Sequence, residues 1–145
     1  MKTAPFILLM LVVGCSSYEK RTYDVTVKNQ SLKPVTLWLT KDGPAWERSW
    51  RAPENVAIES PSTDDRIAGI MVPPGKTAFT GKLTGEFAPG VSAILRVYVG
   101  QRSLSELLAL SHGNPDRLDL TLDPGVNELV VTDDGPGVKV KRAGE

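Results

Sequence analysis

Two tryptophans and two arginines stand close together in a polar part of the chain. Trp46, Arg48, Trp50 and Arg51 fall within residues 41–66, a stretch without an obvious strand pattern that is longer than most loops of a small domain. Tryptophan beside arginine is typical of protein-binding hot spots, and the apolar face of an indole ring can also stack on a sugar. These four residues are therefore our candidate binding residues. The alternative is that both rings fold back over the sheet edge as a local core.

The chain offers no complete catalytic group. Its single histidine, His112, directly follows Ser111, and neighbours in the sequence do not form the hydrogen-bonded base and nucleophile of a serine hydrolase. No Gly-x-Ser-x-Gly motif is present. Two carboxylates for glycoside hydrolysis would need a cleft, of which a small sandwich offers little. We expect a protein that is not an enzyme, and a small hydrolase around His112 is the least favoured hypothesis.

Metal, cofactor and nucleic-acid binding are not expected either. One cysteine and one histidine cannot build the usual zinc or copper site. Glu59, Asp64 and Asp65 could offer oxygens to calcium, but the calcium-loop spacing is missing. The stretch from Pro74 to Thr77 lacks the first glycine of a phosphate-binding loop. The 17 basic residues equal the 17 acidic ones, whereas nucleic-acid binders usually carry a positive excess.

The N-terminus has the three parts of an export signal. Lys2 supplies a positive charge, Phe6 to Val13 form an apolar core, and Gly14 is a small residue directly before the single cysteine, Cys15. The apolar core is too short to span a bilayer, which takes about 20 residues. The sequence therefore predicts a leader that is removed, and no transmembrane anchor.

The residues Val12, Val13, Gly14 and Cys15 resemble the lipobox of bacterial lipoproteins, in which aliphatic and small residues precede glycine or alanine and then cysteine. The resemblance covers about the first 17 residues. It implies that signal peptidase II cleaves between Gly14 and Cys15, and that Cys15 carries a diacylglyceryl thioether. Each buried methylene contributes about 0.8 kcal/mol, so two or three acyl chains would hold the domain firmly at a membrane.

The same resemblance bears on location and boundaries. In double-membrane bacteria, aspartate after the lipidated cysteine commonly signals retention in the inner membrane, and Ser16 stands there instead. We therefore expect a lipid-anchored protein of the bacterial cell envelope, on the outer membrane and facing the periplasm. The expected parts are a signal peptide at 1–14, the lipidated cysteine and a short tether at 15–22, and a single domain at 23–145.

The remainder of the chain is typical of an all-β domain. Apolar and polar residues alternate from Tyr23 to Lys28, and turns rich in proline and glycine separate the later apolar stretches. The expected strands are Tyr23 to Lys28, Val35 to Thr40, Ile67 to Val72, Thr77 to Leu83, Ala93 to Val99, Arg117 to Leu122, Glu128 to Thr132 and Val138 to Lys141. This pattern predicts an antiparallel β-sandwich of immunoglobulin-like architecture, with a small barrel as the alternative. The first two strands are expected to form a hairpin.

One short helix interrupts the strands. Ser103 and Glu106 have the spacing of a capping box, and Leu104, Leu107 and Leu108 fall on one helical face. We expect this face to cover one end of the sandwich. A helical turn is also expected at Pro53 to Ile58, and Trp38 is expected in the core.

Together these features favour a non-enzymatic, membrane-anchored lipoprotein that acts as a binding or structural module through residues 41–66. Its partners would be the membrane, through the lipid, and an envelope protein or glycan. The alternative is a small glycan-binding module that stacks sugars on Trp46 and Trp50.

Overall fold

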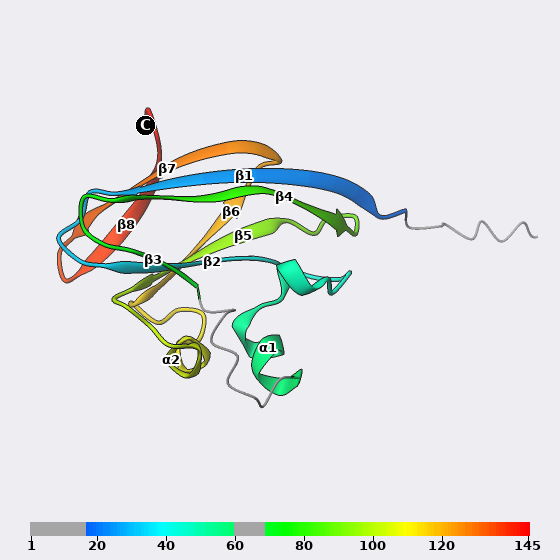
Figure 1. The fold of residues 1–145 in the computed structure, drawn as a ribbon, viewed down its shortest axis with the longest axis horizontal. Helices are drawn as coiled ribbons and strands as arrows, with labels where there is room; N and C mark the ends of the chain where they lie inside the picture. The colour runs from blue at the N-terminus through cyan, green and yellow to red at the C-terminus, as the bar shows by residue number, and fades with distance from the viewer. Residues whose placement is uncertain (1–16, 60–68) are drawn as a thin grey trace, which may run out of the picture.

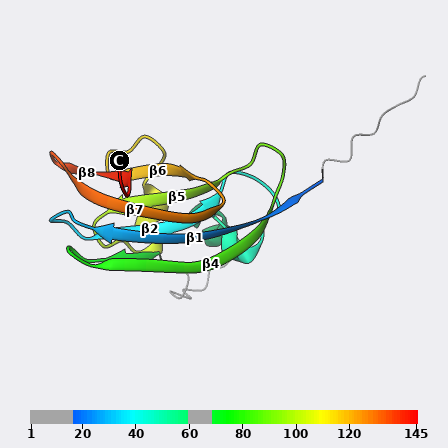
Figure 2. The same cartoon turned by 90° about the horizontal axis from the view of Figure 1, so that it is seen from above.

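The computed structural model describes residues 17–59 and 69–145, and it confirms an all-β sandwich of two four-stranded sheets (Figure 1). Sheet A has the order β4 (Thr77–Phe87), β1 (Glu19–Asn29), β7 (Gly125–Asp134) and β8 (Gly137–Arg142). Sheet B has the order β3 (Ile70–Val72), β2 (Val35–Lys41), β5 (Ala93–Val99) and β6 (Arg117–Leu122). Figure 2 shows the strands of sheet A side by side. The structure shows the two packed sheets, and the immunoglobulin-like detail stays a prediction.

The pairing is antiparallel except between β1 and β7, which run parallel. The predicted hairpin is wrong, because β1 and β2 belong to opposite sheets. Both strands have an apolar face, and placing them in facing sheets buries both faces against each other. Asn29 holds the crossing between the sheets by donating hydrogen bonds to the carbonyls of Lys33 (2.8 Å) and Val72 (2.9 Å).

The first strand begins within the segment predicted as a tether. Glu19 to Thr22 pair with Thr84 to Phe87 before the alternating pattern starts at Tyr23. These residues are mostly exposed, so they carry no apolar periodicity by which a strand is predicted from sequence. Gly14, Cys15 and Ser16 lie outside the described residues.

The interior between the sheets is apolar, with an aromatic group at the end where β1 begins. The buried side chains are Tyr23, Val25, Val27, Val35, Leu37, Trp50, Val72, Phe87, Ala93, Leu95, Val97, Leu122, Leu129, Val131 and Val138. The inward residues of each strand alternate with outward ones, as expected for packed sheets.

Two helices form a third layer over the outer face of sheet B (Figure 1). They are α1 (Pro53–Glu59) and α2 (Leu104–Ala109), so both predicted helical segments and the Ser103 capping box are confirmed. The predicted position of the second helix is wrong, because it covers the outer face of sheet B and not one end of the sandwich. Leu107 is buried in a second apolar cluster with Trp38, Val56 and Tyr98. Trp38 is thus buried as predicted, but beneath the helices instead of between the sheets. In the described parts of the chain, no helix combines the length and hydropathy needed to cross a membrane.

Candidate functional site

Trp50 belongs to the core, so its prediction as a binding residue is wrong. Its side chain is 0% exposed, and its ring lies edge-on to Tyr23 at 5.6 Å and to Phe87 at 5.2 Å between ring centres. The indole nitrogen donates a hydrogen bond to the Thr84 carbonyl at 3.2 Å. Gly85 makes room for the ring, because a Cβ there would lie 2.4 Å from the indole nitrogen. The expected pair of stacking rings therefore does not exist, since only Trp46 of the two is exposed (54%).

A buried lysine fixes the start of the 41–66 segment to sheet A. The Lys41 ammonium contacts the Glu47 carboxylate and the Glu86 carbonyl, and it lies 4.8 Å from the centre of the Phe87 ring. Glu47 also accepts a hydrogen bond of 2.6 Å from the backbone N–H of Glu86. Burial raises the pKa of Glu47, but the hydrogen bonds from Lys41 and Glu86 outweigh it and hold that pKa below its usual 4.5.

This pair should make the stability depend on pH. The folded pKa of Glu47 lies below the unfolded one, so its ionised form stabilises the fold above about pH 4.5, and this contribution is lost as pH falls through the folded pKa. Glu47→Gln should lower the free energy of unfolding near neutral pH by about 1–3 kcal/mol, between the values for exposed and buried pairs. Its acid-induced loss of stability should be smaller than that of the parent.

Urea unfolding at neutral and acidic pH measures both effects, with Glu128→Gln on the exposed side of β7 as the matched control. Equal pH dependence in the parent and Glu47→Gln would rule out this role for Glu47.

A small cleft opens at the edge of sheet B. Among the described residues, β3 pairs only with Val35 to Leu37 of β2, and residues 48–51 lie beside the rest of that edge. Two hydrogen bonds hold this segment in place, from the Trp38 indole to the Arg51 carbonyl (2.8 Å) and from the Thr40 hydroxyl to the Trp50 carbonyl (3.0 Å). The cleft has a volume of about 240 Å³. Its lining comprises Leu37, Trp38, Leu39, Arg48, Ser49, Arg51, Gly69, Ile70, Thr80, Leu83 and Leu95.

The cleft brings together two of the four predicted binding residues, Arg48 and Arg51. Trp46 does not line the cleft. Ser49 does line it, although the sequence did not identify Ser49 as a candidate. The lining is thus mostly apolar, with two arginines and one serine from the 48–51 segment. Such a cleft suits a ligand that combines an apolar group with a hydrogen-bond acceptor or a negatively charged group.

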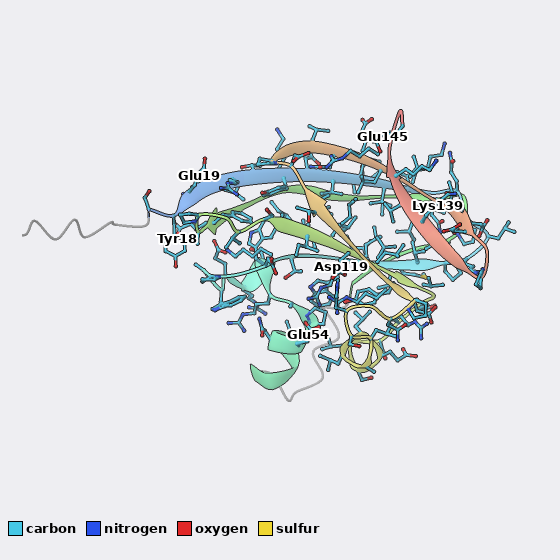
Figure 3. All side chains as sticks on the ribbon, turned by 180° about the vertical axis from the view of Figure 1, so that it is seen from behind. Tyr18, Glu19, Glu54, Asp119, Lys139 and Glu145 are labelled. Atoms are coloured by element: carbon cyan, nitrogen blue, oxygen red, sulfur yellow. The ribbon has the colours of Figure 1, made fainter. Side chains whose placement is uncertain are left out.

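A cluster of charged residues lies beneath the two helices. It was not predicted from the sequence. Arg96 contacts both carboxylate oxygens of Glu54 at 2.9 Å, and Arg117 donates to the two oxygens of Asp119 at 2.9 and 2.8 Å. Figure 3 shows Glu54 and Asp119 near each other on the helix side of the sheet. Arg117 also donates to the Leu110 carbonyl at the end of α2 (3.1 Å). The cluster therefore fastens both helices to sheet B.

The charges in this cluster stabilise one another. Burial raises the pKa of Asp119, but hydrogen bonds from Arg117 and His112 bring it below its usual value. The hydrogen bond with Asp119 in turn raises the pKa of Arg117. Outward positions of a strand normally face solvent, so the sequence pattern did not predict an ion-pair network at Arg96, Arg117 and Asp119.

His112 does not form the pair that a hydrolase needs. Its side chain is 85% exposed, and Nδ1 lies 3.2 Å from the Asp119 carboxylate instead of a serine hydroxyl. Within residues 17–59 and 69–145, no three His, Cys, Asp or Glu side chains gather as metal ligands would. Asp64 and Asp65 lie outside the described residues.

The chain matches no protein-family model, and a search of curated proteins finds no relative. What the edge cleft could bind is therefore inferred from the residues that line it.

Proposed function

We propose that this protein is a non-enzymatic lipoprotein of the bacterial cell envelope that binds another envelope component through the edge cleft. Cys15 would anchor it by lipid, and Ser16 favours the periplasmic face of the outer membrane. The observation that carries the binding role is the cleft itself, because it combines leucine walls with Arg48 and Arg51 in its lining. Residues 41–66 would thus act through their 48–51 portion.

The size of the cleft favours a protein segment as the ligand. Sites for whole small molecules usually measure about 300–1,000 Å³, whereas this one measures about 240 Å³. It can take one large apolar side chain of a partner, with a neighbouring acidic residue paired to Arg48. Trp46 lies outside the cleft and Trp50 is buried, so the cleft offers sugars no pair of exposed rings.

The test is photo-crosslinking in cells from a reactive amino acid placed at Ser49. We expect a covalent adduct with one envelope protein, and we expect Arg48→Glu to weaken its capture at least about tenfold, which corresponds to 1.4 kcal/mol. The matched control places the crosslinker at Thr121, an exposed residue on β6 at the opposite edge of sheet B.

Two results would contradict the proposal. One is the same adducts from both positions, and the other is capture that Arg48→Glu leaves unchanged. A change in tryptophan emission on adding envelope glycans, without any protein adduct, would favour the glycan-binding alternative.

A further inference from the structure

Two aromatic side chains are exposed at the end of the sandwich where β1 begins. Tyr18 is 49% exposed and Trp46 is 54% exposed. The aromatic core at this end is already supplied by Tyr23, Trp50 and Phe87, so the fold does not require the two outer rings. Figure 3 shows Tyr18 and Glu19 at this extremity of the molecule.

Two backbone contacts place the two rings at the same end although they come from distant parts of the sequence. Glu19, which follows Tyr18, pairs with Phe87 of β4. Glu47, which follows Trp46, accepts a hydrogen bond from the N–H of Glu86 on the same strand. The residues that directly follow the two exposed rings therefore contact neighbouring positions of β4, Glu86 and Phe87.

The chain before β1 limits how far this end can stand from an anchor at Cys15. Only Ser16, Ser17 and Tyr18 lie between Cys15 and Glu19, the first residue of β1. At roughly 3.4 Å per residue, this link spans on the order of 14 Å when fully extended. A lipid at Cys15 would therefore keep this end of the sandwich close to the headgroups.

The chemistry of the end suits a neutral lipid surface. Tryptophan and tyrosine are enriched at membrane interfaces, because each has an apolar ring and a polar group that stays hydrated. The charged residues next to these rings in the sequence, together with Glu86, are balanced. Lys20, Arg21, Lys41 and Arg48 stand against Glu19, Asp42, Glu47 and Glu86. A strong attraction to anionic lipids is therefore not expected.

We infer that Tyr18 and Trp46 form a membrane-contacting end that inserts at the lipid–water interface and holds the sandwich with β1 directed away from the bilayer. This inference rests on the proposed lipidation of Cys15. It assigns Trp46 a lipid partner, separate from the edge cleft and its partner. The edge cleft would then face sideways, along the membrane surface.

The test uses the acylated full mature protein, extracted from bacterial membranes and reconstituted into phosphatidylcholine vesicles with and without lipids brominated on their acyl chains. Bromine quenches tryptophan only at close range. Trp38 and Trp50 are buried, so the difference between the parent and Trp46→Phe gives the emission of Trp46. The matched control adds Leu32→Trp to Trp46→Phe, because Leu32 is 85% exposed at the far end of β1.

We expect brominated lipid to remove most of the Trp46 emission and to leave the tryptophan at position 32 unquenched. Equal Trp46 emission in both kinds of vesicle, on protein whose mass shows acylation, would overturn the inference and leave the anchor intact. A protein mass without acyl groups would overturn the anchor, and the inference with it.

Discussion

Replacing Trp50 with alanine is expected to destabilise the protein by about 3–5 kcal/mol, the usual cost of deleting a large buried ring. Trp50 packs against Tyr23 and Phe87 from a segment outside both sheets, so its ring closes the end of the interior. The substitution would also remove the hydrogen bond to the Thr84 carbonyl. Since small domains are stable by only about 5–15 kcal/mol, this loss would be a large part of the total. Urea unfolding followed by circular dichroism measures it.

Trp46→Ala is the matched control, since it deletes the same ring from an exposed site on the same loop. It should change the free energy of unfolding by no more than about 0.5 kcal/mol. Equal destabilisation by the two substitutions would contradict the assignment of Trp50 to the core. Should Trp50→Ala fail to fold, Trp50→Phe still tests the assignment, because it keeps a six-membered aromatic ring in the core and should cost less.

The sequence best predicted the strands that can be recognised from their own residues and from the turn residues beside them. The bounds of β5 and β6 match the expected ones, because β6 alternates clearly, β5 is a short apolar run, and turn residues such as Pro89 and Pro124 stand beyond them. The start of β1 was missed because Glu19 to Thr22 have no buried face. A strand paired at its edge but exposed on both faces leaves no hydrophobic period to detect.

Pairing and burial depended on residues far apart in the sequence. Alternation shows which face of β1 is apolar, but it does not show whether β2 lies beside that strand or across from it. Trp46 and Trp50 look equivalent in the sequence. Only the positions of Tyr23 and Phe87, brought together by other strands, decide that Trp50 is buried and Trp46 is not.

The edge cleft could be predicted only in part. Arg48 and Arg51 were identified from composition, since loops on a rigid scaffold often carry binding residues. In the part of the chain that the structure describes, the cleft lies where β3, only three residues long, stops pairing with β2, and residue types alone do not fix that length. The leucines that line the cleft lie on predicted strands, where they were expected to pack in the core.

Replacing Cys15 with alanine is expected to release the protein from membranes. Two acyl chains bury many methylenes at about 0.8 kcal/mol each, so the lipid would dominate membrane attachment, and Tyr18 and Trp46 alone would not retain the protein. Membrane and soluble fractions of cells, compared by immunoblot, measure the change. Ser17→Ala is the matched control, since it alters the same link but leaves Cys15 and Ser16 in place. Retention of the Cys15→Ala protein in the membrane fraction would contradict a lipid anchor at this residue.

Mass spectrometry of the N-terminal peptide of the protein purified from bacterial membranes tests whether Cys15 is the lipidated first residue of the mature chain. We expect a mature chain that begins at Cys15 and carries a diacylglyceryl group on its sulfur. A chain that retains its first 14 residues, or one whose Cys15 thiol is unmodified, would contradict it.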